Sequence, residues 1–223
     1  MAGCHIELYP ASIRLIQGIR HFAGQMNQTR ISIWIVILSL LLAISCKEDE
    51  PPVLSNNNSS KLVDKNSLPI RSGARPETTR GIPHVQIDVE PVPEVHEEMI
   101  RRIYSIPGID DQPSVVASWR GLWISEDLAV VEPDALIGGR EFAHIHADGS
   151  LHIFLDRRRA NEAVETAWAA FHPYAIQGLD GWEGFVMLYT PQSLEELDVT
   201  FQLIVDGYNN VTGQMILATD YYD

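Results

Sequence analysis

The sequence predicts an α+β domain in which helices pack on one face of a mainly antiparallel sheet. The chain contains several short runs of strand type, two longer segments with apolar residues at helical spacing, and an Asp148-Gly149 turn between two adjacent strand-like runs. Neighbouring strands joined by short turns favour antiparallel pairing. In order, the predicted elements are β-α-β-β-β-α-β-α.

The elements expected before the Asp148-Gly149 turn are a strand at 85–89, a helix at 94–104 and strands at 115–124 and 141–146. Residues 85–89 alternate between apolar and polar types, as a half-buried strand does. In the helix, Val95, Met99 and Ile103 lie four residues apart on one face, and Pro107-Gly108 follows as a stop signal. The run at 115–124 is rich in β-branched and aromatic residues, which favours a strand.

The elements expected after the turn are a strand at 151–155, a helix at 157–171, a strand at 185–189 and a helix from 194 onward. In the first helix, one apolar stripe includes Ala160, Ala163, Val164, Ala167 and Trp168. The second helix is expected to begin after Ser193, whose hydroxyl can accept from main-chain N–H groups of the first turn.

An apolar run at 31–45 precedes Cys46 and indicates export. At about 15 residues it is shorter than the roughly 20 that span a bilayer as a helix, so a signal segment is favoured over an uncleaved membrane helix. The sequence LAISC resembles a lipobox, although Ala43 stands where leucine is usual. We expect Cys46 to be lipidated, residues 1–45 to form the signal segment, and Met26 to be an alternative start.

The residues after Cys46 indicate an acidic tether and a separate domain. The segment 47–50 (KEDE) resembles the export tag of Bacteroidota-type lipoproteins, which implies the outer membrane or cell surface of a Gram-negative bacterium. Polar composition predicts a disordered tether at 46–80 and a folded domain at 81–223. A net charge of −14 argues against nucleic acid as a partner and against direct adhesion to anionic lipid head groups. We therefore expect the chain to contact the membrane through the lipid on Cys46.

Four histidines concentrate around the predicted hairpin: His144, His146, His152 and His172. His144 and His146 are two apart on a strand and share a face, as a metal clamp requires. A two- or four-residue loop would pair His146 with Leu151 and turn His152 away, whereas a three-residue loop with a bulge would pair His146 with His152. Both registers are open. A metal site would combine His144 and His146 with His152 or His172, and the metal candidates are His144, His146 and His152.

Gly138 followed by His144-Ile145-His146 also matches the first half of the cupin metal motif. The second half of that motif calls for a glutamate a few residues later, where this chain has only Asp148.

The motifs REFAHIH at 140–146, Leu151-His152, Trp168, His172-Pro173 and LYTP at 188–191 occur in the order of a known family. The stretch 138–213 resembles the luciferase domain of the fungal luciferases and their uncharacterised bacterial relatives. In place of a Gly-Pro-rich stretch after His172-Pro173, this chain has 174–178 (YAIQG), and its hairpin loop is two residues shorter.

The resemblance implies an oxygen-dependent oxidoreductase of the luciferase-like monooxygenase type, because the fungal members oxidise a hydroxypyrone luciferin with molecular oxygen and no established organic cofactor. The expected substrate is a small phenolic or enolic molecule. The expected catalytic residues are His144, His146 and His172, and the expected substrate-binding residues are Arg140, His152, Trp168 and Tyr189. His144 or His146 would take the substrate proton.

Two other interpretations use the same residues. The domain could bind a small ligand or capture a metal without turnover, with Trp168, His172 and Tyr189 lining the cleft. The histidines could instead be half-buried structural residues. Strand alternation places Glu141 on the face opposite His144, which predicts a structural role for this carboxylate. Arg140 would hold an anionic substrate or pair with Glu141.

Overall fold

The computed structural model describes residues 67–116 and 120–222, which belong to one compact unit of the chain at 61–223. The proposed signal segment, Cys46 and the tether up to residue 66 lie outside the described residues. Residues 67–80, which composition assigned to the tether, contact the domain. The main-chain N–H of Leu68 donates to Glu162, and Trp168 Nε1–H donates to the carbonyl of Pro69 over 2.7 Å.

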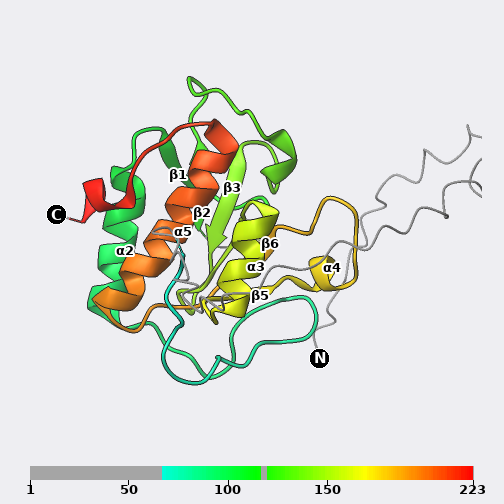
Figure 1. Ribbon diagram of the computed structural model, residues 1–223. Coiled ribbons are helices and arrows are strands. Elements are labelled where there is room, and N and C mark those ends of the chain that lie inside the picture. Colours follow the sequence, from blue (N-terminus) through cyan, green and yellow to red (C-terminus); the bar gives the residue numbers. More distant parts are fainter. Residues whose placement is uncertain (1–66, 117–119, 223) are drawn as a thin grey trace, which may run out of the picture. The chain divides into compact units, whose positions relative to one another are not determined.

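The fold is α+β, as predicted: a six-stranded antiparallel sheet in the order β1-β2-β3-β4-β6-β5. The strands are β1 (Ile109–Pro113), β2 (Arg120–Ile124), β3 (Glu141–Ile145), β4 (Leu151–Phe154), β5 (Ala169–Phe171) and β6 (Phe185–Leu188). The helices are α2 (Pro93–Ser105), α3 (Arg157–Glu165), α4 (Pro173–Ile176) and α5 (Leu194–Thr212), with short 3-10 helices at Pro133–Ala135 and Ala218–Tyr221. Figure 1 shows α3 and α5 in front of the strands.

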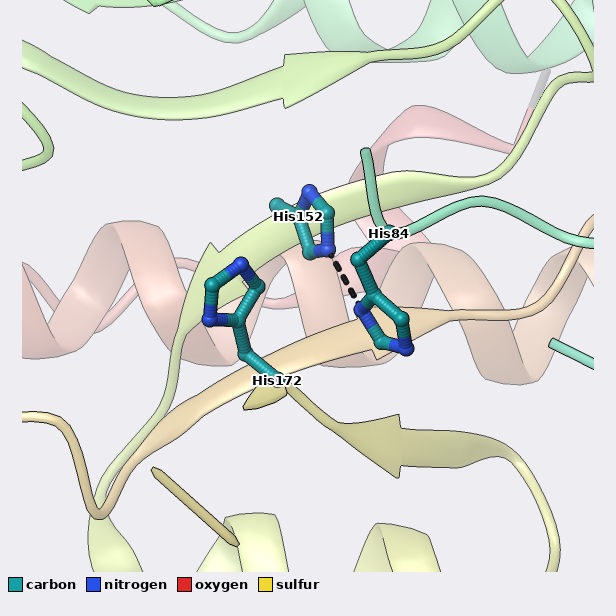
Figure 2. Close-up of side chains that lie close together, drawn as sticks. All are labelled: His84, His152 and His172. Atoms are coloured by element: carbon teal, nitrogen blue, oxygen red, sulfur yellow. Dashed lines mark hydrogen bonds between the residues drawn. The ribbon is translucent and has the colours of Figure 1, made fainter. Parts of the chain in front are cut away.

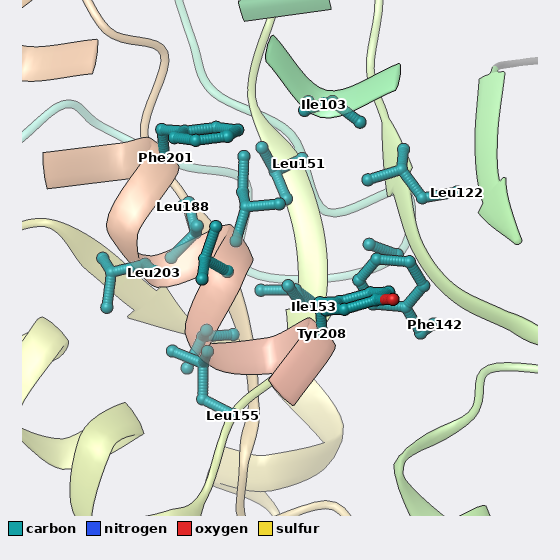
Figure 3. Packing of buried hydrophobic residues seen from close by; sticks show 14 of the residues in the cluster. Ile103, Leu122, Phe142, Leu151, Ile153, Leu155, Leu188, Phe201, Leu203 and Tyr208 are labelled. Atoms are coloured by element: carbon teal, nitrogen blue, oxygen red, sulfur yellow. The ribbon is translucent and has the colours of Figure 1, made fainter. Parts of the chain in front are cut away.

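The apolar core lies between the sheet and helices α2 and α5. Leu151, Ile153 and Leu188 are fully buried on this face of the sheet, and Figure 3 shows them beside Phe201 and Leu203 of α5. Helix α5 comes close to β4 at Gly207, where an added Cβ would lie 2.5 Å from Ile153 Cδ1. Small size at this position therefore allows the helix to approach the strand.

Several elements with strong local sequence patterns form where they were predicted. Helix α2 and the strands β3, β4 and β6 form within a residue or two of their expected bounds. Helix α5 begins after Ser193, whose hydroxyl accepts from the N–H of Glu196. It ends at Gly213, which adopts the left-handed conformation typical of a helix C-terminus.

The helix predicted at 157–171 is wrong in its second half. Helix α3 stops at Glu165, and Ala167 adopts a left-handed backbone with φ of 67°. The N–H of Trp168 then bonds to the carbonyl of Ala163, which closes the helix end, and 169–171 pair with β6 as edge strand β5. Alanine gives no sequence signal for such a turn, and pairing with the sheet prevailed over local helix propensity.

The strand predicted at 85–89 does not join the sheet, since only Gln86 forms an isolated bridge, with Thr78. The strand predicted at 115–124 is shorter: β2 covers 120–124, 115–116 are not strand, and 117–119 lie outside the described residues. The preceding strand β1 was not predicted, because its sequence IDDQP lacks alternation and only Ile109 is buried. Within the described ranges, no helix is both long and apolar enough to cross a membrane.

Candidate functional site

The face of the sheet opposite the core carries the histidines. Along β4, Leu151 and Ile153 point to the core, whereas His152 points to the other face. We call His84, His144, His146, His152 and His172 the histidine cluster; each is only 3–5% exposed. Five buried imidazoles beside one another need mutual hydrogen bonds or a common ligand.

The hairpin register brings His152 onto the same face as His144 and His146. His144 pairs directly with His152, and His146 N–H donates to the carbonyl of Ser150 around a three-residue loop. Neither register expected from the sequence occurs, since His152 lies opposite His144 and not His146. The turn uses Gly149 with φ of 81° and Asp148, whose carboxylate accepts from Ser150 N–H.

A β-bulge reverses the alternation at the start of β3. Leu122 pairs with Ala143, but the next residue, Trp123, pairs with Glu141. One extra residue of β3 is therefore accommodated at this point of the pairing with β2. Glu141 consequently shares the face of His144, and its Oε1 lies 3.1 Å from His144 Nδ1. The sequence prediction that Glu141 points to the opposite face is therefore wrong.

The hydrogen bonds of the surrounding groups assign the ring protons of His144. Oε1 of Glu141 accepts from the Ser114 hydroxyl and Oε2 from the N–H of Val115, each over 2.7 Å. This carboxylate is an acceptor, so His144 Nδ1–H donates to it. In the neutral form of this ring the lone pair is consequently at Nε2, 3.2 Å from His152 Nδ1.

His146 is oriented in the same way by the hairpin turn. The Ser150 hydroxyl donates to Asp148 Oδ1 over 2.7 Å and so accepts from His146 Nδ1–H over 2.9 Å. The lone pair of His146 is therefore also at Nε2, which lies 3.0 Å from His152 Nδ1. Two ring nitrogens with lone pairs thus face the same nitrogen of His152.

His84 and His172 complete the cluster from two other segments, as Figure 2 shows. His84 precedes α2 and places its Nδ1 3.0 Å from His152 Nε2. His172 is the N-cap residue of α4, and its Nδ1 accepts from the N–H of Tyr174 over 3.2 Å. The proton of a neutral His172 ring is therefore at Nε2, where it can act only as a donor.

Burial lowers the pKa of four members of the cluster, His84, His146, His152 and His172. Desolvation, followed by the neighbouring imidazoles, lowers the pKa of His146 to about 3 and that of His172 to about 4. The same causes lower the pKa of His152 well below its usual range, and burial lowers that of His84. Neutral imidazoles are metal ligands and hydrogen-bonding groups, and those with a strongly lowered pKa are weak proton acceptors.

The cluster lines one side of a cavity of about 250 Å³. Its other walls are apolar or aromatic: Ile82, Pro83, Val116, Ile137, Tyr174, Trp182 and Phe185. The rings of Tyr174 and Trp182 meet edge to face at 4.9 Å, and Phe185 stacks on His152 at 5.2 Å. A larger hollow of about 690 Å³ beside α5 is lined by charged and amide groups together with apolar side chains, and contains no histidine. Of these two cavities, the smaller one is therefore the candidate site.

Two groups of histidines have the spacing of metal ligands: His144, His146 and His152, and His84, His152 and His172. The potential ligand atoms of each group lie within 4.8 Å of one another. The first group is the metal-candidate set expected from the sequence, and by spacing either group could bind a metal ion.

Three residues expected to bind substrate do not line the cavity. Arg140 donates to the carbonyls of Ile124, Ser125 and Leu128 and fixes that loop. Trp168 and Tyr189 are buried, and the guanidinium of Arg71 lies 5.9 Å from the ring centre of each. Of the expected set, the cavity therefore brings together His144, His146, His152 and His172.

Sequence reasoning missed His84, Tyr174, Trp182 and Phe185. His84 contacts a residue 68 positions away, and no local pattern predicts such a contact. The density of aromatic residues between His172 and Phe185 was a usable signal, because aromatic groups gather in small-molecule sites.

Comparison with known protein families gives a match that includes most of this site. The family model described as "Luciferase domain" matches residues 139–205, which include β3, β4, β6 and four of the five clustered histidines. The comparisons with curated proteins and with solved structures found no significant match. The order of motifs on β3, β4 and β6, the cavity that they line and the family match lead to one conclusion: the chain contains a luciferase-like domain.

Proposed function

We propose that the domain oxidises a small phenolic or enolic molecule with molecular oxygen in the cavity beside the histidine cluster. The observation that carries this proposal is the composition of the cavity: lone-pair nitrogens on one side and aromatic walls on the other. The match to the luciferase domain supports the same reaction class by analogy, and fold-level likeness alone does not transfer a reaction.

The size and walls of the cavity favour a planar, mostly apolar substrate. A volume of about 250 Å³ lies below the ~300–1,000 Å³ of drug-sized pockets, which suits a compact, one- or two-ring molecule. Tyr174, Trp182 and Phe185 offer ring faces and edges against which a planar ring can stack. A hydroxyl on such a ring would face the histidines.

The proposed reaction adds one oxygen molecule to one substrate molecule. The substrate hydroxyl loses its proton, and the resulting anion transfers two electrons to oxygen as a carbon–oxygen bond forms. The proton ends on the outer oxygen, so the first product is a hydroperoxide that contains all atoms of substrate and oxygen. Carbon is oxidised by two electrons and oxygen is reduced to the peroxide level.

The cluster supplies two complementary roles for this reaction. His144 Nε2 favours the anionic substrate as a proton acceptor, whereas His146, whose pKa is lowered to about 3, would favour it as a ligand of a transition-metal ion. His172 carries its proton at Nε2 and donates a hydrogen bond to a developing negative charge. Glu141 does not touch the cavity and acts as a positioning residue for His144.

The test is oxygen uptake by the purified full-length chain with a panel of phenols, enols and hydroxypyrones. We expect one oxygen consumed per substrate, and a loss of turnover of about 10²–10⁴-fold in His144→Ala. His96→Ala is the matched control, because His96 lies on α2 and does not line this cavity. Binding of these compounds without oxygen uptake would contradict the oxidation and establish a non-catalytic binding protein.

We also propose that the mature chain is a cell-envelope lipoprotein anchored through Cys46. The supporting features are the apolar run at 31–45, the lipobox-like LAISC and the acidic KEDE that follows it. Metabolic labelling with a radioactive fatty acid should mark the wild-type chain but not Cys46→Ala. Equal labelling of both chains would contradict this anchor.

A further inference from the structure

We propose that His144, His146 and His152 bind one divalent first-row transition-metal ion through Nε2, Nε2 and Nδ1, with its open side toward the cavity. This inference concerns binding alone, and it stands or falls separately from the proposed oxidation.

The distances between the ring nitrogens are close to those of ligands around one ion. His152 Nδ1 lies 3.0 Å from His146 Nε2 and 3.2 Å from His144 Nε2. Imidazole nitrogens about 2.0–2.1 Å from a tetrahedral metal lie about 3.3–3.4 Å apart. These two distances therefore need to grow by only a few tenths of an ångström, and the potential ligand atoms of all three residues lie within 4.8 Å of one another.

The ring protons favour an ion over hydrogen bonds within this group. Glu141 and Ser150 each accept an Nδ1–H, which leaves lone pairs on the Nε2 atoms of His144 and His146. Without a metal, His152 Nδ1 can direct only one N–H toward these two Nε2 atoms. With a metal, all three nitrogens present lone pairs to one cation, and no proton is shared.

Each proposed ligand also has an acceptor for its outer N–H, as histidine ligands of metals almost always do. The acceptors are Glu141 for His144 and Ser150, backed by Asp148, for His146. His152 Nε2–H then donates to His84 Nδ1 over 3.0 Å. His84 is thus a positioning residue from a segment distant in sequence.

The second group, His84, His152 and His172, does not meet these conditions. His84 Nδ1 and His152 Nε2 are joined through a proton, and His172 Nδ1 is occupied by the N–H of Tyr174. The structure therefore distinguishes two groups of equal spacing by their hydrogen-bond partners. Three neutral imidazoles suit zinc, copper, iron or nickel, whereas calcium and magnesium prefer oxygen ligands.

The experiment is a Co²⁺ titration of the full-length chain in detergent after removal of metals with a chelator. We expect one Co²⁺ per chain with visible ligand-field bands, which Zn²⁺ displaces. His144→Ala combined with His146→Ala should weaken Co²⁺ binding by more than about 100-fold, because it removes two ligands. His172→Ala and His96→Ala are the matched controls, and each should keep affinity within about threefold of the wild type.

Two results would overturn the site: no saturable Co²⁺ binding by the wild type, or equal loss in His172→Ala and the double variant. If the double variant does not fold, proton NMR of the wild-type Co²⁺ complex decides. We expect three exchangeable, strongly shifted N–H signals, from Nδ1 of His144 and His146 and Nε2 of His152; a different number contradicts the ligand set. Cobalt binding without oxygen uptake would leave this site intact and contradict only the oxidation.

Discussion

The two faces of β3 and β4 have opposite chemistry although their residues alternate along the same strands. On the face toward α5, Leu151 and Ile153 are fully buried among aliphatic and aromatic side chains. On the other face, His144, His146 and His152 are almost equally buried, but they contact polar ring nitrogens. Burial alone therefore does not distinguish core from site; the partners of the buried groups do.

This difference indicates which face stabilises the fold. Burying neutral imidazoles contributes little beyond the hydrogen bonds that offset their desolvation, whereas each apolar side chain contributes a favourable transfer free energy. We expect the apolar face to determine stability and the histidine face to determine binding.

The largest expected effect is on the apolar face. Ile153→Ala should lower the free energy of unfolding by about 2–5 kcal/mol, because it opens a cavity where Gly207 brings α5 against β4. Urea denaturation followed by circular dichroism measures the change. An effect no larger than that of His172→Ala would contradict the division between the two faces.

Glu141→Gln should have an intermediate effect, which lowers both the stability of the fold and the affinity for Co²⁺. The fully buried carboxylate accepts from Ser114, Val115 and His144, and an amide cannot accept all three hydrogen bonds. We expect a loss of about 1–3 kcal/mol in unfolding free energy and a fall of about 10–100-fold in Co²⁺ affinity. Glu126→Gln, on the surface, is the control, and equal Co²⁺ affinity in the two variants would exclude a positioning role.

Gln86→Ala tests the segment that carries His84. The Gln86 side chain accepts from Thr190 N–H over 2.9 Å and donates to the Thr190 hydroxyl over 3.1 Å. We expect a loss of about 1–2 kcal/mol and faster amide exchange at 82–86, with α5 unchanged. Exposed Gln112→Ala is the control. Unchanged exchange at 82–86 would show that other contacts fix His84.

The smallest expected effect lies far from the histidine face, where Glu98 contacts Arg101 and Arg102. The hydrogen bond from Arg101 is the largest cause that lowers the pKa of Glu98, to about 2. Its contribution is therefore present above pH 4.5 and is lost as the pH falls toward 2. Glu98→Gln should lower the unfolding free energy by about 0.5–1 kcal/mol near pH 7, and the difference should shrink below pH 4.5. A difference that stays constant with pH would contradict the ion pair as its source.

The comparison also separates what local sequence predicted from what it missed. Apolar spacing predicted α2 and α5, and the flanks of Asp148-Gly149 predicted β3 and β4, since those signals act within a few residues. The same signals failed at Ala167, which ends α3 in a left-handed turn without a glycine. Arg140, Trp168 and Tyr189 were expected to bind substrate, and they do not line the cavity beside the histidines.

By itself, the sequence determined the α+β class, the hairpin with His144 and His146 on one face, and the luciferase-like motif order. Only the tertiary structure decided the rest of the site. The bulge in β3 turned Glu141 toward His144, the register placed His152 opposite His144, and the segment before α2 delivered His84. The physical reason is that alternation and helical spacing are local, whereas bulges, register and long-range contacts depend on the pairing of whole strands.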